Sequence, residues 1–370
     1  MRLAIIRRLY SDFGGAEIFI NRLISQLNLE DVSIISNKWT TSNQPTKFIH
    51  ADQSGLTRKS RLIRFNQSVS EILRKENFDI TQSHERMCGI DIFRAGDGVH
   101  ASWLEKLSRE SGHTKKFWLK HDPYHQEVLR LEKLMAQDSR ITFVANSTMT
   151  KNDLINYLNL PQDRIVTIKN GFDNSQIKLP TPQEKLTSKL KLGINPDLPF
   201  ILFVGSGFER KGAHLLVKTA EISPDIQIGI VGKDKRLDKL KTIIHQKKLE
   251  NRVFIYGPQK DIAQYYQAAD IFCLPSLYDS FSNAVLEALA YGLPCVLTEN
   301  VGMHDAVNLF YAGTSCQRNF ESIADAIRLA INNKTQLSTN ALALSKKYSN
   351  ENSSKAWADL YQSIMNAKTK

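Results

Sequence analysis

Two acidic residues near the C-terminal end of the chain have a spacing that suits one anionic ligand. Asp279 precedes an apolar run and Glu287 lies inside it, eight positions later (287 − 279 = 8). The preceding segment, Ala269–Ser276, is typical of a buried strand that runs into a loop. We therefore expect both acids where a strand ends and a helix begins, with backbone N–H groups and the helix dipole favouring an anion. The alternative is a capped helix that carries a surface acid.

A glycine-rich basic loop is the second candidate. Arg210 and Lys211 lie between Gly205 and Gly212, directly after an apolar run that predicts a strand. An arginine presents a bidentate fork to a phosphate and a lysine presents a point charge. Both could stabilise the negative charge that grows on a leaving diphosphate. The alternative is a solvated basic turn.

Two further loops carry residues of interest in the first half of the chain. Gly14 and Gly15 follow the first expected strand and open a helix, so backbone could approach a diphosphate closely there. The pair is not a G-x-G-x-x-G fingerprint, and a purely structural turn is the alternative. Asp97 ends a strand-like run between two glycines and is a candidate for orienting a substrate or accepting a proton.

The elements that must position these residues alternate between strands and helices. Apolar runs of strand length alternate with stretches whose apolar residues recur at helical spacing, which predicts parallel, doubly wound sheets. The expected strands are Leu3–Ile6, Val32–Ile35, Ile141–Asn146, Ile165–Lys169, Phe200–Gly205, Ile226–Gly232, Val253–Tyr256, Ile271–Leu274 and Cys295–Thr298. The expected helices are Ala16–Leu27, Leu62–Leu73, Gln126–Ala136, Ala213–Ala220, Leu237–Lys247 and Ile262–Ala268.

Length and turn residues predict two domains. A chain of 370 residues is long for one core, and proline and glycine interrupt the pattern before the strand at Phe200. We expect an N-terminal Rossmann-like domain at 1–172, a linker at 173–198 and a C-terminal Rossmann-like domain at 199–350. Ligands of such folds bind at the carboxyl ends of the strands, and we expect the two domains to face a central cleft.

Composition narrows the class of protein. The apolar content of 42% and the charged content of 24% describe a globular protein, and no apolar run approaches the length of a bilayer span. Four scattered cysteines fit a reduced compartment and no metal-site spacing, so we expect no metal and no cofactor. The start of the chain lacks a signal-peptide pattern, which predicts a cytoplasmic protein. The formal charge of +11 favours an anionic partner.

These motifs resemble those of the retaining GT4 glycosyltransferases, which have the GT-B fold. The pair Asp279 and Glu287 is similar to the acid-x7-acid motif of that family, although the first acid of the family is usually Glu. Arg210 beside Lys211, and Asp97 in place of a common histidine, resemble the branch that glucosylates the lipopolysaccharide core. The resemblance covers nearly the whole chain. It implies that the N-terminal domain at 1–172 binds the acceptor and that the C-terminal domain at 199–350 binds the nucleotide sugar. It also implies that a last helix, within residues 351–370, crosses back to the N-terminal domain.

The resemblance implies roles for the site residues. It implies that Glu287 holds the ribose of a UDP-sugar, that Asp279 holds the transferred hexose, and that Lys211 and Asp97 serve catalysis together with it. The donor-binding residues implied by the resemblance are Gly14, Gly15, Arg210, Lys211, Phe281, Ser282, Asn283, Ala284 and Glu287. The implied activity is metal-independent transfer of a hexose, glucose by preference, to a lipopolysaccharide core or a related glycolipid.

Basic residues predict a surface for an anionic membrane. Arg58, Arg61 and Arg64 recur at three-residue spacing opposite apolar residues, which indicates an amphipathic helix with a basic face. The segment from Lys115 to His121 mixes cations with aromatic residues, a composition that suits a lipid interface. Its candidate contact residues are Lys115, Lys116, Trp118 and Lys120. A solvated face with its aromatics packed inward is the alternative to peripheral attachment at the inner membrane.

Two alternatives to this function stay open at the level of sequence. One is transfer to a soluble acceptor or to another cell-envelope polysaccharide. The other is a non-catalytic GT-B protein that binds a nucleotide, because a fold alone does not fix a function. A nucleic-acid partner is not expected, since the chain lacks a nucleic-acid-binding motif.

Overall fold

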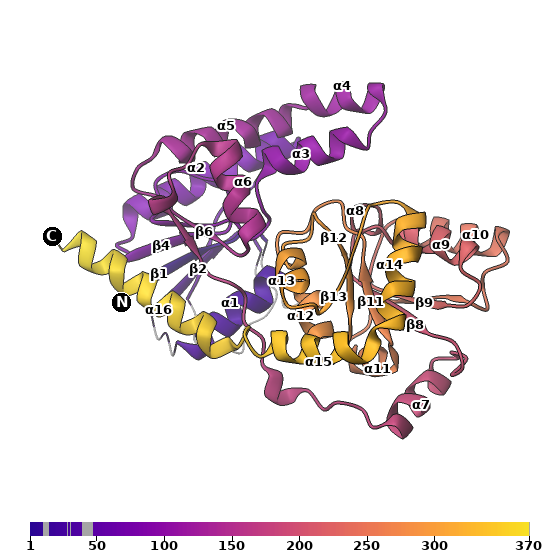
Figure 1. The fold of residues 1–370 in the computed structure, drawn as a ribbon. Coiled ribbons are helices and arrows are strands. Elements are labelled where there is room, and N and C mark those ends of the chain that lie inside the picture. Colours follow the sequence, from indigo (N-terminus) through magenta and orange to yellow (C-terminus); the bar gives the residue numbers. More distant parts are fainter. Residues whose placement is uncertain (10–14, 28, 30, 39–46, 370) are drawn as a thin grey trace. The chain divides into compact units, whose positions relative to one another are not determined.

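The chain forms two compact units, each built around its own sheet (Figure 1). The computed structural model describes residues 1–9, 15–27, 29, 31–38 and 47–369. The first unit comprises Met1–Gly171 together with Asn350–Lys370, and the second comprises Phe172–Ser349.

The sheet of the first unit contains seven strands in the described part of the chain, in the order β3-β2-β1-β4-β5-β6-β7. Every pair of neighbouring strands is parallel. The strands are β1 (Leu3–Ile6), β2 (Val32–Ser36), β3 (Lys47–His50), β4 (Ile80–Ser83), β5 (Ile92–Arg94), β6 (Thr142–Ala145) and β7 (Ile165–Thr167). The whole of β1 is buried, as expected of a parallel strand that is covered on both faces.

Helices cover both faces of this sheet. Leu3 and Ile5 of β1 pack with α1 (Gly15–Gln26), while Ala4 and Ile6 belong to a second core cluster that includes side chains of α2 (Arg58–Lys75). The remaining helices of the first part of this unit are α3 (His100–Arg109), α4 (His113–His121), α5 (Pro123–Gln137) and α6 (Thr148–Leu158), followed by the 3₁₀ turn η1 (Gln162–Arg164). The alternation of side chains along β1 therefore gives each face of the sheet its own core.

The last helix belongs to the first unit although it follows the second unit in sequence. In α16 (Asn350–Lys368), Trp357 is fully buried in the core cluster of α1 and β1. The hydroxyl of Tyr361 donates to Oε1 of Gln82 in β4 at 2.7 Å. The chain thus returns to its first sheet after completing the second (Figure 1).

The second unit has a six-stranded parallel sheet in the order β10-β9-β8-β11-β12-β13. Its strands are β8 (Phe200–Val204), β9 (Gln227–Val231), β10 (Val253–Gly257), β11 (Ile271–Leu274), β12 (Cys295–Thr298) and β13 (Gly313–Cys316). Both sheets are doubly wound, so the fold class expected from the sequence is confirmed.

Helices surround the second sheet. They are α7 (Pro182–Lys191), α8 (Phe208–Lys211), α9 (Ala213–Ile222), α10 (Leu237–Gln246), α11 (Ala263–Ala268), α12 (Asn283–Ala290), α13 (His304–Leu309), α14 (Phe320–Asn332) and α15 (Lys334–Ser345), with the 3₁₀ turn η2 at Asn174–Gln176. Helix α7 lies within the segment expected as a linker and packs against α11. Its Lys189 also forms an ion pair of 2.8 Å with Asp270, directly before β11. Among the described residues, no helix combines the length and apolarity needed to cross a membrane.

Candidate functional site

The loops after β8 and β11 meet at the carboxyl edge of the second sheet. These strands are neighbours, so the loops that follow them emerge side by side. The backbone N–H of Leu277, after β11, donates to the carbonyl oxygen of Arg210, after β8, at 2.7 Å. Gly212 has a φ of +86°, and a Cβ there would lie 2.3 Å from the carbonyl oxygen of Pro275. The glycine therefore permits the close approach of the two loops.

Lys211 and Asp279, both predicted site residues, form an ion pair at this edge. The Nζ of Lys211 lies 3.1 Å from Oδ2 of Asp279, with side chains only 14% and 12% exposed. The lysine side chain runs over Gly205, where a Cβ would lie 2.6 Å from its Cδ. Burial opposes the charge of Asp279, but the attraction of Lys211 and Arg210 outweighs it and holds the pKa of the carboxyl below its ordinary value.

Arg210 is fixed beside this pair. Its Nη1 donates to the carbonyl oxygen of Tyr278 at 2.6 Å, which leaves the guanidinium next to the residue that precedes Asp279. Arg210, Lys211 and Asp279 therefore form one charged group with an excess positive charge at the edge of the sheet. Such a group can balance a phosphate that binds beside it.

The turn that leads into α12 has an unusual backbone. Ser282, directly before the helix, has a φ of +70° and a ψ of +96°, which a residue with a side chain rarely adopts. It is 6% exposed, and its buried Oγ has no hydrogen-bond partner in the described structure. Phe281 is buried, and Asn283 and Ala284 begin α12. A buried hydroxyl without a partner at a helix N-terminus is consistent with a site for a polar ligand.

Glu287 lies one turn into α12 and is held by a tyrosine that the sequence pattern did not single out. The hydroxyl of Tyr266 in α11 donates to Oε2 of Glu287 at 2.8 Å. Burial and the neighbouring carboxylate raise the pKa of Tyr266 well above its ordinary value, so it stays a donor at neutral pH. The ring of Tyr291 stacks on Tyr266 at 5.2 Å between centroids. Only the tertiary packing of α11 on α12 brings Tyr266 to Glu287.

The structure brings Asp97 together with basic residues of the first unit. Asp97 follows β5, and the guanidinium of Arg7, after β1, lies 3.2 Å from its Oδ2. The same Arg7 lies 3.4 Å from Glu85, after β4. Because β1, β4 and β5 are consecutive in the sheet, these side chains gather at its carboxyl edge. Gly14 lies outside the described residues, and Gly15 begins α1.

Three arginines surround the exposed carboxylate of Asp97. Desolvation raises the pKa of Asp97, but the charges of Arg7, Arg86 and Arg94 and the hydrogen bond from Arg7 outweigh it, so the pKa lies below the ordinary value. Arg86 donates to the carbonyl oxygen of Gly98 at 2.9 Å and thereby supports the loop. Arg94 is almost fully buried and lies over the ring of Phe19. Arg94 ends β5, three positions before Asp97, whereas Arg7 and Arg86 reach it from distant parts of the sequence.

Two histidines near this loop are packed rather than free. His100 Nε2 lies 3.1 Å from His125 Nδ1, and burial together with Arg86 lowers the pKa of His100 to about 3. His84 is buried, and desolvation lowers its pKa. Both histidines are therefore neutral at pH 7.

The basic surfaces differ in how far they are neutralised. In α2, Arg58 forms an ion pair with Asp122 at 2.7 Å and Arg64 with Asp52 at 2.8 Å. Nε of Arg61 donates to the carbonyl oxygen of Gly55. Helix α4, which carries Lys115, Lys116 and Lys120, buries no residue. Its Phe117 and Trp118 are 60% and 72% exposed, so the aromatics of this helix do not pack inward.

Comparison with known proteins agrees with this geometry. Two doubly wound parallel units, each with charged loops at the carboxyl edge of its sheet, have the architecture of the GT-B fold. The family described as "Glycosyltransferase Family 4" matches residues 13–176, and the one described as "Glycosyl transferases group 1" matches residues 184–349. The two matches leave little of the chain uncovered, and the chain belongs to this glycosyltransferase family.

Individual relatives are more distant. A D-inositol 3-phosphate glycosyltransferase of Xylanimonas cellulosilytica is 26% identical over 63% of this chain, and the match spans only 59% of that relative's own length. The crystal structure of WaaG, a glycosyltransferase involved in lipopolysaccharide biosynthesis, is similar with a TM-score of 0.83 and 19% identity over 97% of this chain and 99% of that one. Anabaena HepE in complex with UDP and glucose has a TM-score of 0.73 and 16% identity over 98% and 100% of the two chains. At these identities, the solved structures support the fold alone.

No group of three or more His, Cys, Asp or Glu side chains that could hold a metal ion occurs in the part of the chain that the structure describes. The positive charge at the edge of the second sheet comes instead from Arg210 and Lys211.

Proposed function

We propose that the protein is a retaining glycosyltransferase that moves a hexose, glucose by preference, from a UDP-sugar to a lipopolysaccharide core or a related glycolipid. The observation that carries the proposal is the buried Lys211–Asp279 pair, with Arg210 beside it, next to the turn that opens α12. This arrangement offers positive charge for a diphosphate and a carboxylate for sugar hydroxyls within one rigid unit.

Each part of the donor has a partner in this proposal. Arg210 and Lys211 face the diphosphate, and the backbone from Phe281 to Ala284 caps it at the start of α12. Glu287, one turn further, accepts hydrogen bonds from the two ribose hydroxyls, because a carboxylate can accept from a vicinal diol. The hydrogen bond from the hydroxyl of Tyr266 holds the carboxylate of Glu287 in position. A bound complex of the similar HepE chain with UDP and glucose supports a UDP-sugar as donor.

The chemistry follows from charge development at the sugar. The bond between the anomeric carbon and the diphosphate oxygen breaks, and negative charge grows on the diphosphate, where Arg210 and Lys211 stabilise it. The acceptor hydroxyl forms its bond to the anomeric carbon on the same face, and its proton passes to the departing diphosphate. Asp279 and the neighbouring amides hold the sugar. Asp97 orients the acceptor, because a carboxylate with a lowered pKa is a weak base.

The acceptor part of the proposal rests on the surface of the first unit. The exposed aromatic and basic helix α4 and the formal charge of +11 fit peripheral attachment to an anionic membrane. The similar WaaG structure is of an enzyme of lipopolysaccharide biosynthesis, which supports a glycolipid acceptor at the cytoplasmic face of the inner membrane.

A soluble phosphorylated acceptor is the second candidate. Relatives named D-inositol 3-phosphate glycosyltransferase and a similar structure of sucrose-phosphate synthase from Thermosynechococcus elongatus favour it. The basic edge around Arg7, Arg86 and Arg94 could meet a phosphate as well as a lipopolysaccharide core.

The first experiment identifies the donor. The purified protein is mixed with a panel of UDP- and GDP-sugars, and thermal stabilisation and slow donor hydrolysis are followed. Stabilisation by UDP and hydrolysis of UDP-glucose are expected, since a ligand that binds only the folded state raises its stability. Stabilisation without hydrolysis of any sugar would favour a non-catalytic protein, and no stabilisation by any nucleotide would contradict the proposed donor site.

A further inference from the structure

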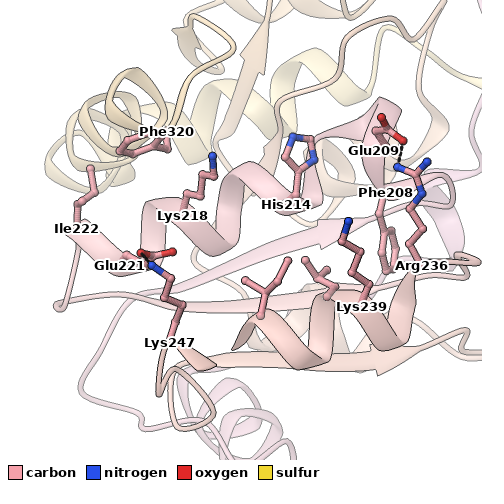
Figure 2. A pocket seen from close by; sticks show the side chains of 12 residues that line it. Phe208, Glu209, His214, Lys218, Glu221, Ile222, Arg236, Lys239, Lys247 and Phe320 are labelled. Atoms are coloured by element: carbon pink, nitrogen blue, oxygen red, sulfur yellow. Dashed lines mark hydrogen bonds and ion pairs between the residues drawn. The ribbon is translucent and has the colours of Figure 1, made fainter. Parts of the chain in front are cut away.

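A groove on the second unit is lined by side chains that the proposed reaction does not use. It has a volume of about 640 Å³ and is lined by side chains of α8, α9 and α10 and by Phe320 at the start of α14 (Figure 2). Arg210, Lys211, Asp279 and Glu287 do not line it. Its volume lies within the ~300–1,000 Å³ typical of small-molecule sites.

The floor and one end of the groove are apolar. Phe208 and Leu240 are buried, and Ile243 lies beside them on α10. At the end where α9 finishes, Ile222 and Phe320 face the groove (Figure 2). The side chain of Ile222 is 42% exposed. Covering this apolar wall with a ligand would remove its exposed apolar surface from water, which favours binding.

The rim carries more positive than negative charge. Four cations (Lys218, Arg236, Lys239 and Lys247) and two acids (Glu209 and Glu221) line the groove, which gives a formal excess of 4 − 2 = +2. Both acids are already paired, Glu209 with Arg236 and Glu221 with Lys247. No carboxylate lies within ion-pair distance of Lys218 or Lys239 among the described residues.

The two cations without a carboxylate stand on opposite walls. Lys218 projects from α9 and Lys239 from α10, with His214 between them (Figure 2). The Nζ of Lys218 lies 5.9 Å from the centroid of the Phe320 ring. The charge of Lys218 is therefore next to the apolar end of the groove. His214 has its pKa lowered, chiefly by desolvation, and serves as a neutral hydrogen-bonding group at pH 7.

We propose that this groove binds a small anionic amphiphile, with an acyl or aryl group on the apolar floor and a carboxylate or phosphate between Lys218 and Lys239. The excess positive charge of the rim disfavours cationic ligands. The apolar floor disfavours simple ions, which have no apolar group to place on it. A carboxylic acid and a phosphorylated lipid share this chemistry, so the probes below separate them.

Helix α8 contributes to both the groove and the candidate donor site, and the coupling proposed here rests on the proposed function. Phe208 and Glu209 of this single turn face the groove, while Arg210 and Lys211 of the same turn face the edge of the sheet. The turn is held at its start by a hydrogen bond of 2.6 Å from the N–H of Phe208 to Asp234. An anion held at Lys239 also attracts Arg236, three positions earlier at the start of α10, and we infer that it competes with Glu209 for Arg236 and shifts the turn. Occupancy of the groove therefore changes the affinity for UDP, and UDP changes the affinity of the groove by the same factor.

Calorimetry with four probes tests the site itself. Decanoate and decyl phosphate carry chain and charge, decanol carries only the chain, and inorganic phosphate carries only the charge. Saturable binding of at least one of the first two is expected, with decanol and inorganic phosphate at least tenfold weaker. The stronger of the two chained anions identifies the head group. Binding of decanol as tight as that of the anions, or no saturable binding of either anion, would overturn the proposal.

Charge variants locate the binding. The double variant Lys218→Gln/Lys239→Gln is expected to weaken the better anion at least tenfold, which is about 1.4 kcal/mol. Lys241→Gln is the matched control, since Lys241 lies on the same helix α10 and does not line the groove. Equal weakening by both variants would show a general effect of net charge and would overturn the site.

Titration of UDP with and without the saturating anion tests the link through α8. A change in UDP affinity of at least threefold is expected in the wild type and in Lys241→Gln, and none in the double variant. Unchanged UDP affinity in the wild type, with the anion bound, would overturn the coupling. If UDP does not bind under either condition, the proposed function and the coupling both fail, whereas the calorimetric result for the groove stands.

Discussion

The ammonium group of Lys211 lies 3.1 Å from the carboxylate of Asp279, and both side chains are largely buried. A buried ion pair is costly to break, because the group left behind keeps its charge away from water. In the proposed function this pair, at the strand ends, has a second role: a bound diphosphate attracts Lys211 and leaves Asp279 to the sugar.

Replacement of Lys211 by alanine should lower turnover of the donor sugar at least tenfold, which corresponds to about 1.4 kcal/mol of transition-state stabilisation. The measurement is the steady-state rate of sugar transfer or donor hydrolysis at saturating UDP-sugar. Lys241→Ala removes an equal charge from an exposed position and should leave the rate unchanged. Near-normal turnover in Lys211→Ala would remove this lysine from the mechanism.

Thermal unfolding separates the catalytic role of Lys211 from a structural one. Lys211→Ala leaves Asp279 buried without its nearest cation and should lower the melting temperature, whereas Lys211→Ala/Asp279→Asn should recover part of that loss. If the double variant also recovered turnover, the lysine would act only by neutralising Asp279.

Glu287→Gln should weaken UDP binding about tenfold or more, because hydrogen bonds to a charged group contribute ~1.5–3 kcal/mol. Tyr266→Phe removes the hydrogen bond that positions this carboxylate and should weaken UDP by a smaller factor, corresponding to about 1 kcal/mol. Tyr291→Phe is the control, since it keeps the stacked ring on Tyr266 and removes a different hydroxyl. Calorimetric titration with UDP measures all three. Wild-type affinity in Glu287→Gln would refute the ribose role.

Much of the fold could be predicted from local pattern because its central strands are continuous apolar runs. Buried strands such as β1 and β8 were predicted from the sequence, since parallel strands covered on both faces leave few alternatives. Strands β3, β4 and β13 were missed. The residues of β3, at the edge of the sheet, are mostly exposed. The sequence of β4 is Ile-Thr-Gln-Ser, and that of β13 contains glycine and polar residues, so neither is a continuous apolar run. Their pairing comes from neighbouring strands, which no local pattern reports.

The residues of the candidate site likewise fall into those that a local pattern indicates and those that only tertiary packing brings together. Residues in the loops after strands, such as Lys211 and Asp279, were proposed from their spacing and a family resemblance, and the structure brings these two together. Tyr266 was not found, because it reaches Glu287 only through the packing of α11 on α12. Of the arginines around Asp97, Arg94 ends the same strand β5, whereas Arg7 and Arg86 come from the loops after β1 and β4, which the sheet order brings to it. The groove between α9 and α10 has no sequence motif, and its charge and apolar floor emerge only in three dimensions.

Helix α4 should attach the protein to anionic vesicles. Phe117→Ser/Trp118→Ser removes its exposed aromatic side chains and should lower co-sedimentation with anionic vesicles at least threefold. Leu329→Ser, at an exposed apolar residue of α14, is the matched control and should bind as the wild type does. Binding should fall with added salt, since the Debye length shortens to ~3 Å at 1 M. Equal sedimentation with neutral vesicles would contradict an electrostatic contribution.

Asp97 should act without titrating in the neutral range. Its pKa lies below the ordinary value of 3.8, because the surrounding arginines outweigh desolvation. A group with a lowered pKa is ionised at every pH above its ordinary value and loses its charge only as the pH falls through the lowered pKa. The pH profile of kcat/KM should therefore show no rising limb from Asp97 between pH 5 and 8, in contrast to a general base poised near neutrality.

The variant Asp97→Asn tests this assignment together with the pH profile. Asparagine keeps the shape and removes the charge, so transfer to the acceptor should fall at least tenfold while donor hydrolysis and UDP affinity stay close to the wild type. Arg7→Lys keeps the charge of the partner and loses the arginine fork that contacts Asp97, so it should show a milder form of the same defect. A rising limb near pH 6–7 in the wild type that disappears in Asp97→Asn would instead identify Asp97 as a proton acceptor and contradict the orienting role.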